Sequence, residues 1–274
     1  MDKNGSLYVV ATPIGNLEDI TLRAIKILKE VDLIAAEDTR HTLKLLNHLN
    51  ISKPLISYHR HSEESREDTI IHKLENGENV ALVSDAGTPG ICDPGEILIK
   101  KCIEKQINVI PIPGACAFVN ALIASGLDTK EFIFFGFLPM QKKLRKNKLE
   151  EIKKSQKTIL LYEAPHKLKK TLIELKEIIS DRKIVIAREL TKIHEEFLRE
   201  NINELINISD SLKGEFVIII EGNKQDIEKN EIKTEEELYE FYLSQGFSKK
   251  EIIKEIAKDK NVTKDEIYIK FLNK

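Results

Sequence analysis

The stretch VALVSDAGTPGICDPG, residues 80–95, decides the fold class of this sequence. Its first four residues are apolar and predict a buried strand, and the twelve that follow hold three glycines and two prolines. Glycine permits a positive φ and close approach of a ligand to the backbone, while proline stiffens a turn. An ordinary Pro/Gly turn would use the same residues. A stiff loop directly after a buried strand nevertheless favours a ligand site, because open α/β sheets bind ligands at the carboxyl ends of their strands.

Outward from this stretch, short apolar runs alternate with amphipathic segments. The runs predict strands at 7–11, 33–36, 80–84 and 109–112. Helical spacing of apolar residues predicts helices from about 19 and at 41–49, 62–74, 95–105 and 115–125. Continuous apolar strands separated by helices are typical of a mostly parallel sheet covered on both faces. We therefore expect an α/β fold.

A second block of strands begins near residue 131. Apolar runs predict strands at 132–137, 158–162, 184–187 and 215–220 with a helix at 168–179, a proportion that suggests a mixed sheet. With a boundary in the turn at 127–130, the expected organisation is an N-terminal α/β domain at 1–128 and a C-terminal α/β domain at 129–222.

The last fifty residues differ in character. The polar segment 223–233 predicts a linker. Short helices at 234–241, 249–257 and 264–272 then form a tail (234–274), with Thr234 and Ser248 in positions typical of N-caps. The tail resembles a helix-turn-helix bundle. A helical dimerisation or packing appendage fits the sequence equally well.

Composition excludes several classes of protein. The 274 residues are 41% apolar and 32% charged, which predicts a globular chain of about two domains. No apolar run approaches the ~18–20 residues of a membrane-spanning helix, and the first apolar run is too short for a signal peptide. Three cysteines without a CxxC pair indicate neither a disulfide framework nor a zinc site. We expect a cytoplasmic protein with reduced thiols.

Familiar ligand signatures are absent. The sequence contains no GxxxxGK[ST], GxGxxG, HExxH or GxSxG motif. The segment 59–61 lacks the spacing of metal ligands, so we expect a solvated turn there and no metal site. A second Pro/Gly loop, TPIGN at 12–16, follows the first predicted strand. Two rigid loops over one sheet edge predict a cofactor bound mainly through backbone groups.

Basic residues concentrate after Pro139. Residues 140–170 include eleven Lys and Arg and three acidic residues. Their local charge is +8, in a chain whose net charge is −2. A solvated helix face is the common explanation of such a block. Its contrast with the whole chain favours contact with the phosphates of a nucleic acid.

Eight ordered segments together resemble the tetrapyrrole methylase superfamily, and within it the methyltransferases that modify a cytidine 2′-oxygen of 16S ribosomal RNA. They are VATPIGNLEDITLRA (10–24), AAEDTRHT (35–42), LVSDAGTPGICDPG (82–95), PIPGACA (111–117), FFGFLP (134–139), LLYEAPHKL (160–168), ARELTKIHEE (187–196) and GEFV (214–217). One departure is Cys92, where the family commonly has Ser. The resemblance implies two α/β domains with S-adenosylmethionine in the cleft between them, a C-terminal helical appendage and a homodimer.

The resemblance also implies a cofactor site and a substrate. The implied cofactor contacts are Pro13, Ala86, Gly87, Thr88, Ile91, Cys116, Ala117, Tyr162 and Leu190. The implied reaction is methylation of a decoding-centre cytidine in 16S rRNA, within the small ribosomal subunit. Methylation of a tetrapyrrole or other small molecule with the same cofactor is the alternative.

Two further sets of residues are candidates for catalysis and RNA binding. A ribose hydroxyl is a weak acid, so a general base should assist its methylation. His166 and Glu189 are the candidate bases, and a positioning hydrogen bond is an equally good role for each. Candidate RNA-binding residues are Arg40, Lys142, Lys143, Arg145 and Lys146. Arg40 could equally pair with a neighbouring carboxylate.

Overall fold

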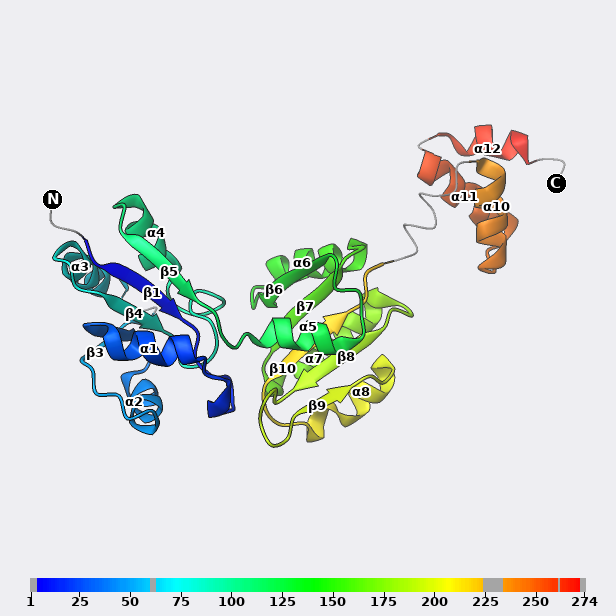
Figure 1. Ribbon diagram of the computed structural model, residues 1–274. Coiled ribbons are helices and arrows are strands. Elements are labelled where there is room, and N and C mark those ends of the chain that lie inside the picture. Colours follow the sequence, from blue (N-terminus) through cyan, green and yellow to red (C-terminus); the bar gives the residue numbers. More distant parts are fainter. Residues whose placement is uncertain (1–3, 60–62, 224–233, 261, 272–274) are drawn as a thin grey trace.

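In a computed structural model, the chain forms two β-sheets flanked by helices and a small helical bundle at the C-terminal end (Figure 1). The structure describes residues 4–59, 63–223, 234–260 and 262–271. The predicted α/β class, with two sheets and C-terminal helices, is confirmed. Most of the predicted linker, 224–233, and residues 60–61 of the predicted solvated turn lie outside the described residues.

The first sheet is parallel throughout, with strand order β3-β2-β4-β1-β5. Its strands are β1 (Ser6–Val10), β2 (Leu33–Ala36), β3 (Leu55–Ser57), β4 (Val80–Val83) and β5 (Asn108–Ile112). Every residue of β2 and β4 is buried. The prediction of a mostly parallel sheet from continuous apolar runs is therefore confirmed.

Helices cover both faces of the first sheet. On one face α1 (Leu22–Glu30) and α2 (Thr39–His48) contribute Leu28 and Leu46 to the core. On the other, α3 (Glu63–Glu75) and α4 (Glu96–Glu104) contribute Leu74 and Leu98. Each buried leucine stabilises the fold by about 1.5–3 kcal/mol. The two helical layers therefore hold the sheet, and with it the loops that follow its strands, in a fixed position.

The second sheet is mixed, as predicted, with order β6-β7-β10-β8-β9. Strands β6 and β7 are parallel, and β10 runs antiparallel to both β7 and β8. The strands are β6 (Phe132–Phe137), β7 (Thr158–Glu163), β8 (Ile184–Arg188), β9 (Glu196–Leu198) and β10 (Phe216–Ile220). One face packs against α6 (Lys142–Lys154), α7 (Pro165–Ile179) and α8 (Ile202–Ile208), beside the short helix η2 (Ser209–Ser211).

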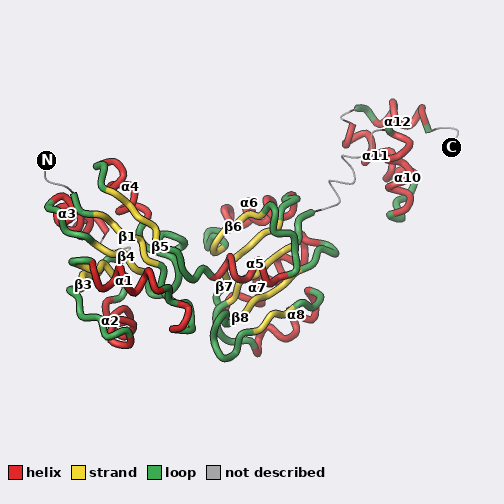
Figure 2. The backbone as a smooth tube through the Cα atoms, viewed as in Figure 1, coloured by secondary structure: helices red, strands yellow, loops and turns green. Residues whose placement is uncertain are grey.

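Helix α5 (Ala117–Ser125) covers the other face of this second sheet. Its Ala121 and Leu122 share a core with Leu160 of β7 and Val217 of β10. The chain reaches α5 from β5 through a loop (Figure 2). Helix α5 therefore packs on the second sheet although it precedes the turn at 127–130, and the domain boundary in that turn stays a prediction.

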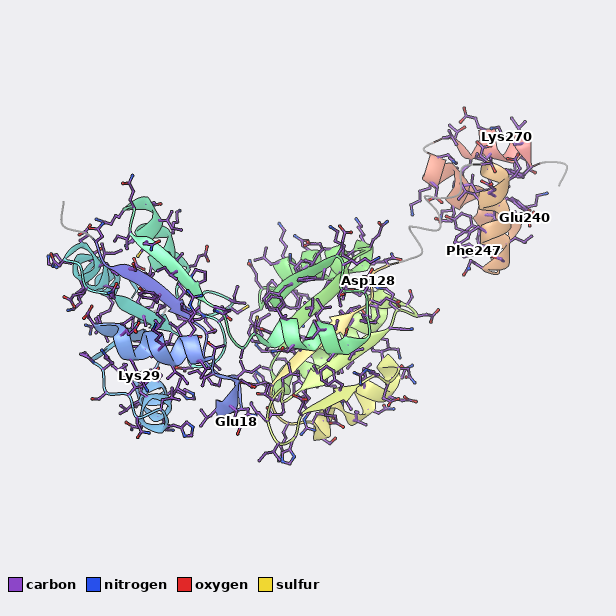
Figure 3. The ribbon with its side chains drawn as sticks, viewed as in Figure 1. Glu18, Lys29, Asp128, Glu240, Phe247 and Lys270 are labelled. Atoms are coloured by element: carbon purple, nitrogen blue, oxygen red, sulfur yellow. The ribbon has the colours of Figure 1, made fainter. Side chains whose placement is uncertain are left out.

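The C-terminal bundle consists of α10 (Glu235–Ser244), α11 (Lys249–Lys260) and α12 (Lys264–Lys270). Thr234 caps α10 through a capping box with Glu237, as its position predicted. The bundle has a core of its own, built around Tyr242, Ile256 and Phe271. Figure 3 shows Glu240, Phe247 and Lys270 on this bundle, away from the two sheets. None of the helices within the described residues is long and apolar enough to cross a bilayer.

Candidate functional site

A cleft of about 470 Å³ lies between the two sheets. Ligand pockets typically measure ~300–1,000 Å³, so the cleft has room for a nucleoside-sized molecule. The first sheet contributes the residues after β1, β2, β4 and β5: Ile14, Glu37, residues 85–88 and 91–93, Cys116 and Ala117. The second contributes Phe137, residues 162–165, Leu190 and residues 215–217. Both sheets therefore form the site.

The two loops singled out in the sequence meet at this cleft. Thr12 and Gly87 exchange backbone hydrogen bonds. The Thr12 N–H donates to the Gly87 carbonyl at 2.8 Å, and the Gly87 N–H donates to the Thr12 carbonyl at 3.0 Å. The Thr88 hydroxyl donates to the Ala115 carbonyl at 3.1 Å, which ties in the loop before α5. Three connecting loops are thus joined into one rigid rim, so little ordering would be needed when a ligand binds.

Gly87 is the position in this rim with little room for a side chain. Its φ of +81° lies in the left-handed region, and a Cβ added there would lie 3.3 Å from Ile14 Cγ2. A side chain would therefore strain the backbone and press on Ile14, which lines the cleft. The position requires glycine for both reasons.

The structure brings together eight of the nine residues proposed to contact the cofactor. The eight that line the cleft are Ala86, Gly87, Thr88, Ile91, Cys116, Ala117, Tyr162 and Leu190. Pro13 does not line it, and its neighbour Ile14 does. Burial raises the pKa of the Cys116 thiol, which keeps it protonated and argues against a role as nucleophile.

The cleft is acidic. Five carboxylate residues line it, and none of its described lining residues is Lys, Arg or His; the five are Glu37, Asp85, Asp93, Glu163 and Glu215. Two hydrogen bonds join the chain after β2 to the chain after β4. Glu37 Oε2 accepts from the Asp85 N–H at 3.3 Å, and Asp85 Oδ1 accepts from the Asp38 N–H at 3.0 Å. Glu215 is already paired with Lys192 at 2.9 Å, and the Glu163 carboxylate accepts from the Ala164 N–H and the Thr171 hydroxyl. The first sheet's carboxylates therefore contribute most to the negative charge of the cleft, which favours ligands that carry positive charge or donate hydrogen bonds.

Tyr162 forms the aromatic wall contributed by the second sheet. Its ring contacts Phe134 and Phe137 edge-on, with centroid distances of 4.9 and 5.7 Å. The Phe118 N–H donates to its hydroxyl at 3.2 Å. Burial raises the pKa of Tyr162 above its ordinary value, so the phenol stays neutral and serves as a fixed wall.

Glu189, a candidate base, lies beside the cleft without lining it. Its Oε1 accepts from Lys192 Nζ at 2.9 Å and from the Glu215 N–H at 3.0 Å. Burial opposes its ionisation, but these two hydrogen bonds together with the positive charges of Lys192 and Arg188 lower the pKa of Glu189. A carboxylate held in this way is a weak base.

The same interactions hold an unusual turn. Glu189 and Thr191 adopt φ values of +50° and +65°, which non-glycine residues rarely do. Leu190 lies between them and lines the cleft. Strained backbone persists only where surrounding contacts enforce it, so the ion pair of Glu189 serves to position Leu190.

His166 and Arg40 also lie outside the cleft lining. His166 is exposed in the first turn of α7, next to Pro165, which lines the cleft. Arg40 is exposed and binds Asp38 through two hydrogen bonds of 3.1 and 2.7 Å. That pair matches the carboxylate alternative left open for Arg40, and it holds the pKa of Asp38 well below its usual range.

Arg145 corrects the predicted set of RNA contacts. Its side chain is buried, donates from Nε to Glu174 at 2.8 Å and from Nη2 to the Thr171 hydroxyl at 2.7 Å. The guanidinium therefore joins α6 to α7 and is not available to a phosphate. Lys142, Lys143 and Lys146 are exposed on the first turns of α6, and the phosphate role proposed for them stays a prediction.

Sequence reasoning missed several cleft residues. Glu37, Phe137, Glu163 and Glu215 line the cleft, and none was among the candidates. Glu37 and Glu163 stand directly after or at the end of predicted strands, a position that could have identified them. Nothing in the local pattern around Glu215 predicts that it faces the other sheet.

Comparison with known proteins agrees with this architecture. The profile of the tetrapyrrole (corrin/porphyrin) methylases matches residues 6–206. Ribosomal RNA small subunit methyltransferase I of Halalkalibacterium halodurans is 51% identical over 273 residues, covering 97% of this chain and 94% of that protein. The protein of the same name from Bacillus subtilis is 50% identical over 271 residues, covering 96% of this chain and 93% of that protein.

Solved structures share the fold at low sequence identity. A diphthine synthase superposes with a TM-score of 0.63 and 14% identity, covering 79% of this chain and 90% of that one. A uroporphyrin-III C-methyl transferase of Thermus thermophilus, complexed with S-adenosyl homocysteine, superposes with a TM-score of 0.57 and 16% identity. The match covers 79% of this chain and 97% of that one. At these identities the likeness shows the fold alone. Because the family profile spans most of the chain and relatives are half identical along it, the chain belongs to the tetrapyrrole (corrin/porphyrin) methylase family.

Proposed function

We propose that this protein transfers a methyl group from S-adenosylmethionine to the 2′-oxygen of a cytidine in the decoding centre of 16S ribosomal RNA. Methyltransferase activity follows from membership of the family. The relatives named ribosomal RNA small subunit methyltransferase I, about half identical to this chain, support the choice of substrate. An rRNA substrate would place the reaction in the cytoplasm. The observation that carries the proposal is the cleft between the two sheets, where eight of the nine residues implied as cofactor contacts come together.

The cleft fits the cofactor in shape and in charge. Small residues Ala86, Gly87 and Ala117 leave the rim open to a ligand that contacts backbone groups, and a Cβ at Gly87 would press on Ile14, which lines the cleft. S-adenosylmethionine carries one more positive charge than negative, which suits a cleft whose described lining residues include carboxylates and no Lys, Arg or His. When bound, it supplies a methyl group attached to a positively charged sulfur. After transfer of the methyl group, that sulfur is a neutral thioether. Pro13, in the proposed set, would act through Ile14.

The residues of the chain supply alignment and a place for the proton. Reacting atoms must approach to about 3–3.5 Å in line, and the rigid rim and the wall formed by Tyr162 and Leu190 would hold both partners. The proton of the ribose hydroxyl needs an acceptor inside the cleft. Glu37 and Asp85 line it, whereas His166 and Glu189 do not. We therefore favour the cleft carboxylates over His166 and Glu189 as the base.

The distribution of charge suggests how RNA would enter. Lys142, Lys143 and Lys146 follow closely after Phe137, which lines the cleft. Phosphates would bind these lysines outside, because the carboxylates inside repel them. Only the sugar and base of one nucleotide would then enter the cleft. A small tetrapyrrole would have no use for these exposed lysines.

The homodimer implied by the resemblance remains a prediction. Helix α5 exposes Val119 and Ile123, which are 41% and 69% accessible, on its outer face. An apolar pair of this kind fits a contact between two copies.

Binding and transfer can be tested separately. Calorimetry should detect S-adenosylmethionine binding to the folded protein. An assay with labelled cofactor should then transfer methyl groups to small ribosomal subunits that lack the modification, and not to uroporphyrinogen. Methyl transfer to the tetrapyrrole alone would overturn the proposal in favour of the small-molecule alternative.

A further inference from the structure

A row of aromatic rings joins α5 to β6 and β7 of the second sheet and ends in an exposed ring. Phe118 stacks on Phe134 at a centroid distance of 4.3 Å, Phe134 meets Tyr162 at 4.9 Å, and Tyr162 meets Phe137 at 5.7 Å. The first three rings are at least partly buried, whereas Phe137 is 56% exposed and lines the cleft. An aromatic ring this exposed inside a ligand cleft is costly unless something covers it.

A bulge in β6 places Phe137 there. The register with β7 pairs Phe134 with Leu160, then Gly136 with Leu161 and Phe137 with Tyr162. Regular alternation would put Phe134 and Phe137 on opposite faces of the sheet, and the extra residue brings both to the face of Tyr162. Bulges near active sites redirect side chains in this way.

Gly136 makes the bulge possible. Its φ is +62°, and a Cβ there would lie 2.6 Å from Cys92 Sγ on the opposite side of the cleft. A backbone irregularity that needs glycine and fits closely against the other half of the molecule indicates that the direction of Phe137 matters.

The chemistry around Phe137 selects its partner. Exposed lysines at 142, 143 and 146 follow it on the chain, and the cleft behind it is acidic. A flat aromatic face beside exposed cations is the combination that binds single-stranded nucleic acid, with the base stacked on the ring and the phosphates on the cations.

We propose that the exposed face of Phe137 stacks on the base of the nucleotide whose 2′-oxygen is methylated. This inference rests on the proposed function and adds the residue that holds the substrate base. Stacking would fix the plane of the base, and through the glycosidic bond it would limit where the ribose hydroxyl lies. Because stacking tolerates any base, Phe137 would contribute affinity and orientation rather than the choice of cytidine.

The first experiment separates substrate binding from cofactor binding. F137L keeps an apolar side chain and removes the aromatic face, so the KM for unmodified small ribosomal subunits should rise roughly 5- to 150-fold, the range that corresponds to loss of one base–aromatic stack. The Kd for S-adenosylmethionine should stay unchanged. F137W should keep the KM near that of the wild type. F132L is the matched control, because Phe132 lies on the same strand, is 42% exposed and does not line the cleft.

The second experiment detects the stack directly. The sequence contains no tryptophan, so F137W would introduce a unique fluorophore. Its emission should be quenched when a cytidine-containing single-stranded RNA binds, whereas the emission of F132W should not change.

An unchanged KM in F137L, or no quenching in F137W, would overturn the inference while the wild-type enzyme still methylates RNA. Weaker cofactor binding in F137L with no change in KM for subunits would also overturn it, since the ring would then be a wall for the cofactor. A wild-type protein that transfers no methyl group to RNA would instead refute the proposed function.

Discussion

Gly87 allows the cofactor site to be tested at one residue. G87V adds a side chain at a φ of +81° and next to Ile14, so calorimetry should show loss of S-adenosylmethionine binding. G126V is the matched control, because Gly126 has a φ of +79° and nothing within 4 Å of an added Cβ. Both variants should lose a similar ~1–2 kcal/mol or more of stability from left-handed strain. Equal cofactor affinity in the two would place the site elsewhere.

Arg145 and Lys146 are neighbours with opposite expected roles. R145A removes the buried partner of Glu174 and Thr171, and urea unfolding should show a loss of about 3 kcal/mol. K146A removes an exposed charge and should change the free energy of unfolding by less than about 0.5 kcal/mol. A stable R145A protein with weakened RNA binding would restore Arg145 to the RNA-binding set.

Glu189 should make stability depend on pH. Its pKa is lowered from an ordinary 4.5 in the folded state, so its contribution is complete above pH 4.5 and is lost as the pH falls through the lower folded value. Urea unfolding should show E189Q less stable than the wild type at pH 7, with the difference shrinking on acidification below pH 4.5. If that difference were constant with pH, the ion pair with Lys192 would not be what holds the turn.

Helix α6 should carry the salt dependence of RNA binding. Replacing Lys142, Lys143 and Lys146 with Ala should weaken binding and flatten the log–log dependence of affinity on salt by roughly 0.7–0.9 for each phosphate that is no longer neutralised. Fluorescence anisotropy over a salt series measures this slope. Replacing Lys249, Lys250 and Lys254 of α11 is the control, and a flattened slope in that variant alone would move the RNA site to the bundle.

Elements with strong local patterns could be predicted from the sequence. The apolar runs at β4 and β10 identified buried strands, and Pro/Gly composition identified the loop after β4 as part of the site. The edge strands β3 and β9 were missed, because each is three residues long and too short to show a period. Arg145 is buried because it binds Glu174 and Thr171 of α7. Phe137 lies on the face of Tyr162 because of the bulge in β6. No local sequence pattern predicts either feature.

Across the whole molecule, the bundle should be separable. Within the part of the chain that the structure describes, its core draws only on residues of α10, α11 and α12 and on Phe271, which directly follows α12. Deleting residues 234–274 should therefore leave the urea midpoint of the remaining chain and its affinity for S-adenosylmethionine unchanged. The slope of RNA affinity against salt should also persist. A collapsed slope in the truncated protein would show that the bundle carries the RNA.

The distribution of the site over two sheets explains why the whole was harder to predict than its parts. Each loop is visible in the sequence, but the cleft exists only because Glu37 and Asp85 from one sheet and Glu163 and Glu215 from the other line the same space. Contacts between residues so far apart in the chain leave no mark in local spacing. The resemblance to a family implied a cleft between two domains, and the structure shows which charged residues line it.

Whether this protein methylates a cytidine ribose in 16S rRNA can be decided by mapping 2′-O-methyl groups in cells that lack it. Mass spectrometry of 16S rRNA fragments should show one 2′-O-methylcytidine missing from the decoding centre. The modification should return when the wild-type protein is supplied and stay absent when G87V is supplied. A 16S rRNA with every 2′-O-methyl group intact in cells without the protein would mean that its substrate lies elsewhere.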